Sequence, residues 1–470
     1  MAKKVEYIIG LETHVQLNTE SKLFCSCRNV ASLKEEPQPN TYVCDVCLGM
    51  PGTKPFLNER VVEYALKVAL ALNCKINPEF YFSRKVYFYP DLAKNYQITQ
   101  YEIPVGYDGY VMVQGKKIRI KRVHIEEDPA KIVHKKNYTL IDYNRSGVPL
   151  LEIVTEPDLS TAEEAREYLF KLKQILEYIG VYDSTTLAVF KSDANISVKG
   201  HERVEVKNIT GIKEVEVALK FEMLRQKQQI LQKREIKRET RRWDEAAKVT
   251  KAMRTKEEEE DYGYILDGDL PVIAVTKKEL EAIKAALPEL PDEKLARFVK
   301  QYGLSEKAAE SLVSEREIAD LFEKAVKLGV SIKEASTWIG RVLKKILNYH
   351  ATTYKASPFK DEWVVDVVKA YEKGEYSDAV AEQILRKMFE DALPLKEIVK
   401  KYGFKKKLSD EQALRKLCEE VASENPKAVE DYKQGNTKAL DFLVGKVMAK
   451  TRGSADPKKA RELLKNLLKL

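Results

Sequence analysis

The sequence lacks long apolar runs and the motifs that most often bind nucleotides. No stretch of about 18 apolar residues occurs, which excludes a membrane-spanning helix, and the apolar stretch near the start is too short for a secretory signal. We therefore expect a soluble, cytoplasmic protein that contacts no membrane. There is no G-x-x-x-x-G-K-[ST] loop and no G-x-G-x-x-G motif after a predicted strand. A nucleotide would have to be held by metal-bridged phosphates on a sheet.

Charge is unevenly distributed along the 470 residues. Charged side chains make up 33% of the chain and the formal net charge is +8. The segment 401–470 alone holds 17 Lys and Arg against 10 Asp and Glu, which is nearly the whole surplus. A basic terminal segment suits a polyanion such as RNA. A solvated helical tail is an alternative that charge alone leaves open.

Hydrophobic periodicity predicts an α+β domain at the start of the chain. The segments 7–17, 110–123 and 187–198 alternate like strands. A helix is predicted after Ser160, with Ser160 and Glu163 forming a capping box and Gly180 ending the helix. Because strands and helices intermix without regular βαβ units, we expect a mainly antiparallel sheet.

The rest of the chain is predicted to be helical. Pro288 and Pro291 mark a boundary, and short amphipathic segments follow. The last segment holds two apolar stripes at helical spacing, and Pro457 is predicted to open the second of these helices. We expect three domains: an α+β domain over 1–290, a helical domain over 291–405 and a small helical tail domain over 406–470.

Four of the six cysteines form two close pairs. Cys25 and Cys27 are separated from Cys44 and Cys47 by sixteen residues, which predicts a tetrahedral Cys₄ zinc site. Four protein ligands leave no open position, so the zinc would be structural. Unmetallated or redox-active thiols are the alternative. Cys74 and Cys418 are predicted to be ordinary buried residues.

Several acidic residues predict a site for a divalent cation. Strand alternation places Glu12 and His14 on one face of the segment 9–17. Glu152 lies inside an apolar run, where an unpaired charge is costly. Carboxylates that converge with a histidine suit Mg²⁺ or Mn²⁺. Glu126 and Glu127 are adjacent in sequence, so both can bind one metal only if a bulge or strand end intervenes.

A series of motifs in order resembles a known family over essentially the whole chain. The motifs are Gly10–Leu17, Leu48–Gly52, Phe82–Leu92, Lys94–Ile98, His124–Asp128, Asp142–Val154, Lys207-Asn208, Glu239–Arg241, Met253–Glu257, Phe442–Met448 and Thr451–Gly453. Together they resemble the GatB family, the B subunits of the GatCAB aminoacyl-tRNA amidotransferases.

The resemblance implies a reaction and partners. Members of the family use ATP and Mg²⁺ to phosphorylate the side-chain carboxylate of Glu-tRNA(Gln) or Asp-tRNA(Asn). Ammonia from the amidase subunit GatA then displaces the phosphate, in a heterotrimer that also contains GatC. The first domain is expected to be similar to glutamine synthetase in fold. The sequence does not say which of the two misacylated tRNAs is used.

Site residues are carried over from the same motifs. The set expected to bind Mg²⁺ and act in catalysis is Glu12, His14, Glu126, Glu127 and Glu152, with Asp193 as a weaker metal ligand. Residues expected to contact the nucleotide or the tRNA end are Arg84, Lys85, Tyr89, Lys94, Tyr96, Arg145, Lys207 and Asn208.

Two other functions fit parts of the sequence. A noncatalytic, zinc-containing tRNA scaffold would explain the cysteines and the basic tail, but it has no use for buried carboxylates, which RNA repels. A stand-alone ligase for a small acid would explain the carboxylates but not the basic tail.

Overall fold

The chain forms two compact units, Met1–Glu293 and Lys294–Leu470. The computed structural model describes residues 5–253, 263–406, 411–451 and 455–468, so parts of the motifs at 253–257 and 451–453 lie outside the described residues. The division into three domains stays a prediction. No helix among the described residues has the length and apolar character to cross a membrane.

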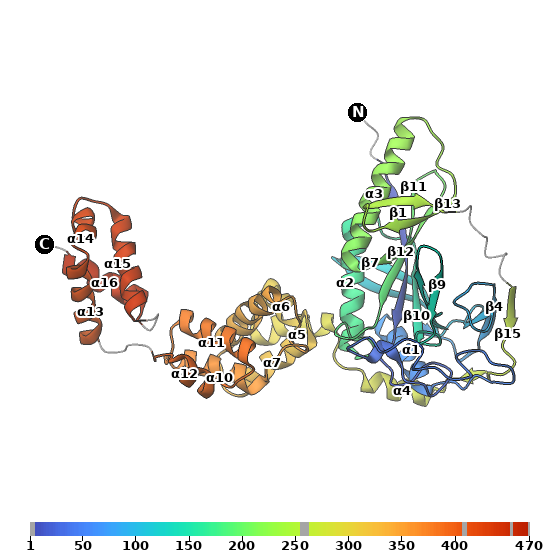
Figure 1. Cartoon of the computed structure of the whole chain (residues 1–470), viewed down its shortest axis with the longest axis horizontal. Helices are drawn as coiled ribbons and strands as arrows, with labels where there is room; N and C mark the ends of the chain where they lie inside the picture. The colour runs from blue at the N-terminus through green and yellow to red at the C-terminus, as the bar shows by residue number, and fades with distance from the viewer. Residues whose placement is uncertain (1–4, 254–262, 407–410, 452–454, 469–470) are drawn as a thin grey trace. The chain divides into compact units, whose positions relative to one another are not determined.

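A twelve-stranded sheet organises the first unit (Figure 1). Its strands run in the order β14-β13-β12-β11-β1-β10-β7-β5-β4-β15, with β6 beside β7 and β2 beside β6. Among the described strands, only β12 and β13 pair in parallel. The bounds are β1 Tyr7–Gln16, β2 Lys75–Ile76, β4 Ser83–Val86, β5 Tyr96–Thr99, β6 Gly106–Val113, β7 Lys116–Glu127, β10 Pro149–Thr155, β11 Phe190–Val198, β12 Val204–Thr210, β13 Glu239–Asp244, β14 Val249–Ala252 and β15 Gly263–Leu266.

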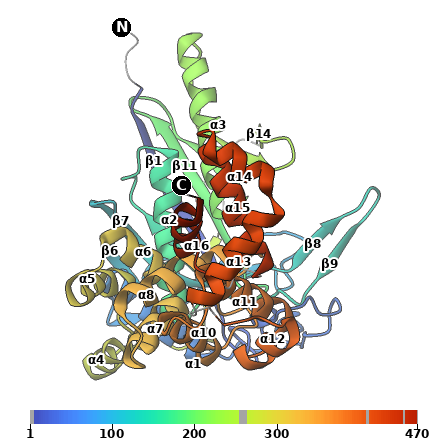
Figure 2. The same cartoon turned by 90° about the vertical axis from the view of Figure 1, so that its left-hand side faces the viewer.

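Two short sheets complete the strands of this unit. β3 (Glu79–Phe80) pairs with β16 (Ile273–Ala274). β8 (Lys131–His134) and β9 (Thr139–Asp142) form a hairpin that projects from the rest of the first unit (Figure 2). The unit therefore combines a large mixed sheet with helices, which agrees with the α+β class expected from the sequence.

Helices cover one face of the large sheet and leave the other face uncovered. The helices of this unit are α1 (Glu59–Ala71), α2 (Ala162–Tyr178), α3 (Ile212–Leu231) and α4 (Lys277–Ala286), with a 3₁₀ turn at Val30–Ser32. Figure 1 shows α2 and α3 along the sheet, and α3 contacts β11 and β12. In β1 the side chains of Leu11 and Val15 are buried in the core that α2 completes, as alternation predicts. Glu12 and His14 point to the opposite face.

Two local predictions need correction. The helix α2 is capped by Thr161, whose hydroxyl accepts from the Glu164 N–H, while the Glu164 carboxylate accepts from the Ser160 N–H. The capping interaction is therefore one residue later than predicted, because Thr161 offers an equivalent hydroxyl. The segment 110–123 is not one strand: Gln114 and Gly115, both with positive φ, turn the chain between β6 and β7.

The described residues of the second unit form helices joined by loops and no strand, and its first helix begins three residues before the boundary of the unit. Its helices are α5 Pro291–Tyr302, α6 Glu306–Val313, α7 Arg316–Lys327, α8 Ile332–Thr337, a π-helical turn at Trp338–Leu343, α9 Lys344–Tyr349, α10 Asp361–Glu372, α11 Asp378–Asp391, α12 Leu395–Tyr402, α13 Glu411–Glu424, α14 Pro426–Lys433, α15 Thr437–Lys450 and α16 Pro457–Leu468. The two predicted stripes lie on α15 and α16 and supply a buried core, and Pro457 opens α16 as predicted.

Candidate functional site

Strand register brings a histidine, a glutamate and a second histidine into one row on the open face of the sheet. β10 lies between β1 and β7. Glu152 of β10 is directly opposite His14 of β1 on one side and His124 of β7 on the other. Residues that are directly opposite in a sheet point to the same face and are close enough to interact. Strand pairing therefore brings His14 beside two residues that lie more than a hundred positions further along the chain.

The row and Glu126 form a compact group of metal-type ligands. His14 Nε2 lies 3.3 Å from Glu152 Oε2 and 3.8 Å from Glu126 Oε1. Ligand atoms of His14, Glu126 and Glu152 all lie within 4.8 Å of one another. Two carboxylates and one imidazole around one point are a suitable ligand set for a hard divalent cation. Three of the six residues expected to bind Mg²⁺ are thus brought together.

Sequence reasoning missed His124 as a site residue. Its Nε2 lies 3.5 Å from Glu152 Oε2 and 3.9 Å from Glu126 Oε2, and the residue is 4% exposed. Its Nδ1 is buried without a hydrogen-bond partner among the described residues. The signal was present, because His124 and Glu126 are two residues apart in a strand and so share a face.

Opposite charges determine the protonation of this group. Burial lowers the pKa of His14, but the hydrogen bond and charge of Glu152, together with the charge of Glu126, raise it overall to about 10. Burial raises the pKa of Glu152, yet His124 and His14 hold it well below its usual value. Without a metal, the protonated imidazole of His14 therefore compensates the carboxylates. Bound Mg²⁺ would supply the compensating positive charge in place of the imidazole proton.

Glu12 and Asp193 lie beside the cluster in the next row of the sheet. They are directly opposite each other across β1 and β11. Asn195 donates to Glu12 Oε1 at 2.9 Å, and the Asn208 N–H donates to Asp193 at 2.9 Å. Burial and the nearby charges of Glu152 and Asp193 raise the pKa of Glu12. Both acids are thus held next to the cluster but outside its closest group.

Glu127 lies on the other side of β7 from Glu126. The register between β7 and β10 is regular at both residues, so no bulge intervenes at this point. Glu127 instead forms a 2.6 Å ion pair with Lys94 and accepts from the Ile98 N–H. The structure therefore does not bring Glu127 to the cluster. Of the two irregularities that its metal role required, a bulge is absent here, whereas β7 does end at Glu127, and its role as a metal ligand stays a prediction.

A pocket of about 850 Å³ opens over the cluster. Its acidic lining comes from Glu12, Glu126, Glu152 and Glu205, with His124 between them. Its basic lining comes from strands toward both ends of the sheet. The residues are Lys85, Arg122, Arg203, Lys207, Arg242 and Lys251. Among its aromatic residues, Tyr101 and Tyr264 are stacked, with ring centroids 3.8 Å apart.

Three of these cations form a row across β12, β13 and β14. Lys207 is opposite Arg242, and Arg242 is opposite Lys251. Like charges that are directly opposite in a sheet destabilise it. Lys207 lies 3.6 Å from Glu205, and Lys251 pairs with Asp244. Such a row at the edge of a pocket is a suitable binding site for a multiply charged anion.

The expected nucleotide and tRNA contacts separate into two groups. Lys85, Tyr89 and Lys207 line the pocket. The remaining five are engaged elsewhere: Arg84 pairs with Asp267 and Asp269, Lys94 pairs with Glu127, Tyr96 packs under Arg84 and Lys94, Arg145 donates to the carbonyls of Pro129 and Ala130, and the Asn208 backbone supports Asp193.

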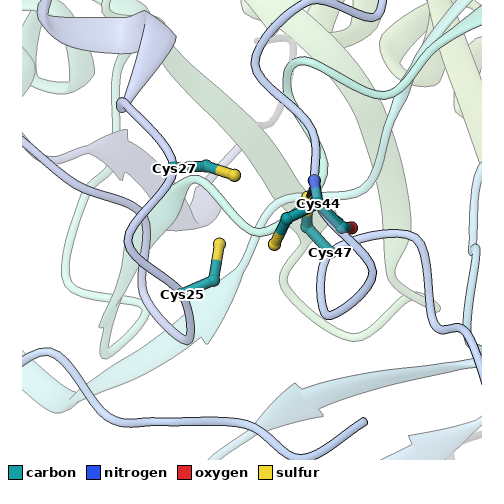
Figure 3. Close-up of side chains that lie close together, drawn as sticks. All are labelled: Cys25, Cys27, Cys44 and Cys47. Carbon is teal, nitrogen blue, oxygen red and sulfur yellow. Dashed lines mark hydrogen bonds between the residues drawn. The ribbon is translucent and has the colours of Figure 1, made fainter.

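The four paired cysteines converge as the sequence predicts (Figure 3). Their sulfurs lie within 4.8 Å of one another. A tetrahedral zinc with Zn–S bonds of about 2.3 Å places its sulfurs about 3.8 Å apart, so the residues fit this metal. A hydrogen bond with Cys25 lowers the pKa of Cys47 to about 5, with Lys22 contributing and burial opposing. Cys74 and Cys418 are buried elsewhere, as expected.

Comparisons with known proteins identify the family to which the chain belongs. The model of the GatB/GatE catalytic domain family matches residues 7–281, and the GatB domain model matches residues 320–468. The B subunit of the aspartyl/glutamyl-tRNA(Asn/Gln) amidotransferase from Methanoregula boonei is 45% identical over 99% of this chain and 98% of its own length. The proteins of the same name from Carboxydothermus hydrogenoformans and Thermotoga maritima are 43% and 42% identical, over 99% and 98% of both chains. This chain belongs to the GatB family of aminoacyl-tRNA amidotransferase B subunits.

Proposed function

We propose that the first unit phosphorylates the side-chain carboxylate of glutamate on tRNA(Gln), or of aspartate on tRNA(Asn), and then amidates it. A carboxylate oxygen of the aminoacyl group attacks the γ-phosphorus of ATP, and ADP leaves. Ammonia then attacks the acyl carbon, phosphate leaves and a proton is lost. GatA is the proposed source of ammonia, in a complex with GatC. The observation that carries the proposal is the His14–Glu126–Glu152 cluster, whose two carboxylates line a pocket that also holds a cationic row.

The cluster is the proposed Mg²⁺ site. His14, Glu126 and Glu152 are the central ligands, and Glu12 and Asp193 extend the set at its edge. Mg²⁺ bound there supplies positive charge that stabilises the transferring phosphoryl group. His124, through its contacts with Glu126 and Glu152, orients both carboxylates. An acidic site on a large sheet also supports the proposal of a fold similar to glutamine synthetase.

The cationic row is the proposed site of the ATP phosphates. Lys207, Arg242 and Lys251 face the same pocket as the carboxylates and carry the opposite charge. A substrate with several phosphates and a carboxylate needs both kinds of neighbour: cations for its phosphates, and carboxylates that hold Mg²⁺ against them. The stacked pair Tyr101 and Tyr264 offers an aromatic surface for a base.

The remaining proposals concern the four paired cysteines and the segment 406–470. The four cysteines hold a structural zinc, since four thiolates leave no open coordination position. The segment 406–470 forms the third domain and binds tRNA through its excess of lysine and arginine. Deleting this segment should raise the KM for tRNA and leave ATP binding unchanged.

The decisive experiment measures ADP formation by the reconstituted complex with misacylated and with uncharged tRNA. A kinase requires Mg²⁺ and the misacylated form. Glu152→Gln should abolish this ADP formation, whereas Glu156→Gln, the same substitution just beyond β10 and outside the pocket lining, should leave it intact. A tRNA scaffold without catalytic function would give no ADP that depends on the aminoacyl group. Full activity of the Glu152→Gln complex would overturn the site assignment.

A further inference from the structure

A lysine side chain is completely buried beside the four cysteines. Lys22 has no exposed surface. Its ammonium donates to the carbonyl of Tyr42 at 2.8 Å, to the carbonyl of Tyr143 at 3.3 Å and to the sulfur of Cys47 at 3.6 Å. An ammonium has three protons to donate, so these three contacts use all of them. The side chain is therefore held in one orientation, toward the sulfur.

The charge of Lys22 has no carboxylate partner among the described residues. Glu127 is close to the same loop, but its ion pair is with Lys94. Burying an ammonium without a counter-charge is strongly unfavourable, and two carbonyl dipoles compensate it only in part. The remaining contact is Cys47. A negatively charged sulfur at that position supplies the missing counter-charge, whereas a neutral thiol or a disulfide does not.

We propose that Lys22 is a charge-compensating positioning residue of the metal centre. The inference rests on the proposed zinc site. Four thiolates around one divalent zinc carry a net charge of −2, and of the four cysteines Cys47 is buried while the other three are half-buried. An ammonium against one of the sulfurs halves that charge and fixes the orientation of the ligand. Groups that hydrogen-bond to metal ligands in this way tune the affinity of the site.

Lys22 also connects the three chain segments that meet at the centre. Its own N–H donates to the Cys27 carbonyl of the first cysteine pair. Its ammonium reaches the second pair through Tyr42 and Cys47. The third contact, Tyr143, begins the loop that leads into β10, and Ser146 of that loop donates to the Cys47 carbonyl. The ammonium thus ties the metal centre to the strand that carries Glu152.

The test compares zinc retention in the full chain with and without the charge. Lys22→Met removes the ammonium at similar volume and should speed zinc release to a chelator by about 10- to 100-fold. Lys344→Met is the control, because that half-buried ammonium donates to the Ser311 carbonyl and the Ser314 hydroxyl without touching sulfur. It should release zinc at the rate of the unsubstituted chain. Equal rates for Lys22→Met and the unsubstituted chain would overturn the proposal.

Two further measurements cover a failure of Lys22→Met to fold. Lys22→Arg keeps the positive charge and should retain zinc far better than the neutral variant. In the unsubstituted chain labelled with ¹⁵N-lysine, the buried ammonium should give a slowly exchanging signal, assigned by its loss in Lys22→Arg, that shifts when zinc is removed. An unshifted signal contradicts the contact. Zinc content separates the two claims: an unsubstituted chain without zinc removes the metal centre itself, whereas stoichiometric zinc with unchanged release removes only the role of Lys22.

Discussion

The first unit holds two groups of metal-type ligands that differ in chemistry and in construction. The cysteine centre is built from four sulfurs on two short loops, and its ligand set is closed. The carboxylate centre is built from His14, Glu126 and Glu152 on three strands, and it faces a pocket of about 850 Å³. A closed set of soft ligands stabilises a fold, whereas an open set of hard ligands leaves positions for a substrate. The zinc and the Mg²⁺ proposed for these two centres would therefore have separate tasks in one unit.

The largest expected effect separates two adjacent residues of β7. Glu126→Gln removes a carboxylate of the open centre and should reduce phosphate transfer to misacylated tRNA by at least about 100-fold, the upper range for losing a supporting residue of a metal site. Glu127→Gln removes an ion pair on the other side of the strand, so its main effect should be on thermal stability. Rapid-quench assays and calorimetry measure the two effects. Equal losses of transfer in both variants would contradict the assignment of Glu126 and Glu127 to opposite faces.

The next effect is on the cysteine centre. Cys44→Ser should leave the chain without stoichiometric zinc. Loss of a structural metal is among the few changes that cost more than about 4 kcal/mol, which corresponds to a Tm drop of roughly 10 °C for a unit of this size. Elemental analysis and calorimetry provide the measurements. Full zinc retention in this variant would disprove the Cys₄ centre.

Competition between protons and Mg²⁺ for His14 should make metal binding at the carboxylate centre depend on pH. In the metal-free chain the pKa of His14 is raised to about 10, above the ordinary value of 6.5. Binding of Mg²⁺ near neutral pH must therefore displace a proton, so affinity should rise by about tenfold per pH unit over pH 7–9. The same shift means that His14 stabilises the metal-free fold below pH 6.5, and this contribution disappears as the pH rises through about 10. Calorimetry in buffers of different ionisation enthalpy measures the released proton, and an affinity independent of pH would exclude His14 as a ligand.

The smallest expected effect concerns the cationic row. Arg242 is exposed at the pocket edge, where water and salt screen its charge. Arg242→Met should raise the KM for ATP by about three- to tenfold, in line with the loss of one charge-assisted hydrogen bond at an exposed position, and should leave kcat nearly unchanged. Steady-state kinetics at two salt concentrations measure this. An effect on tRNA affinity alone would reassign the row to the tRNA.

The two centres also differ in how far the sequence could predict them. The cysteine pairs are local, so spacing alone indicates four converging sulfurs. Alternation within one strand likewise predicts the shared face of Glu12 and His14. The position of His124 opposite Glu152 depends on which strands pair, and that information is not local. The same limit applies to the row of Lys207, Arg242 and Lys251, which exists only through the register of β12, β13 and β14.

Glu127 shows where resemblance and geometry differ. The motif that carries the resemblance includes both Glu126 and Glu127. A bulge in the strand would have allowed both side chains to face the same metal. Because the register is regular, successive side chains of β7 alternate between the two faces of the sheet. Glu127 therefore points away from Glu126 and pairs with Lys94. Composition favours a contact with the nucleotide or the tRNA end for the basic residues near Tyr96, yet Arg84 and Lys94 already have carboxylate partners. Charge composition along a segment does not tell which cations remain available for a ligand.

The central claim is that the open centre binds the catalytic metal and the closed centre binds zinc. The most direct test is anomalous X-ray diffraction from crystals of the complex soaked with Mn²⁺ and a non-hydrolysable ATP analogue, recorded at the manganese and zinc edges. We predict manganese among His14, Glu126 and Glu152, next to phosphates that reach the Lys207–Arg242–Lys251 row, and zinc among the four cysteines. Manganese beside Glu127, or no manganese on this face of the sheet, would contradict the account.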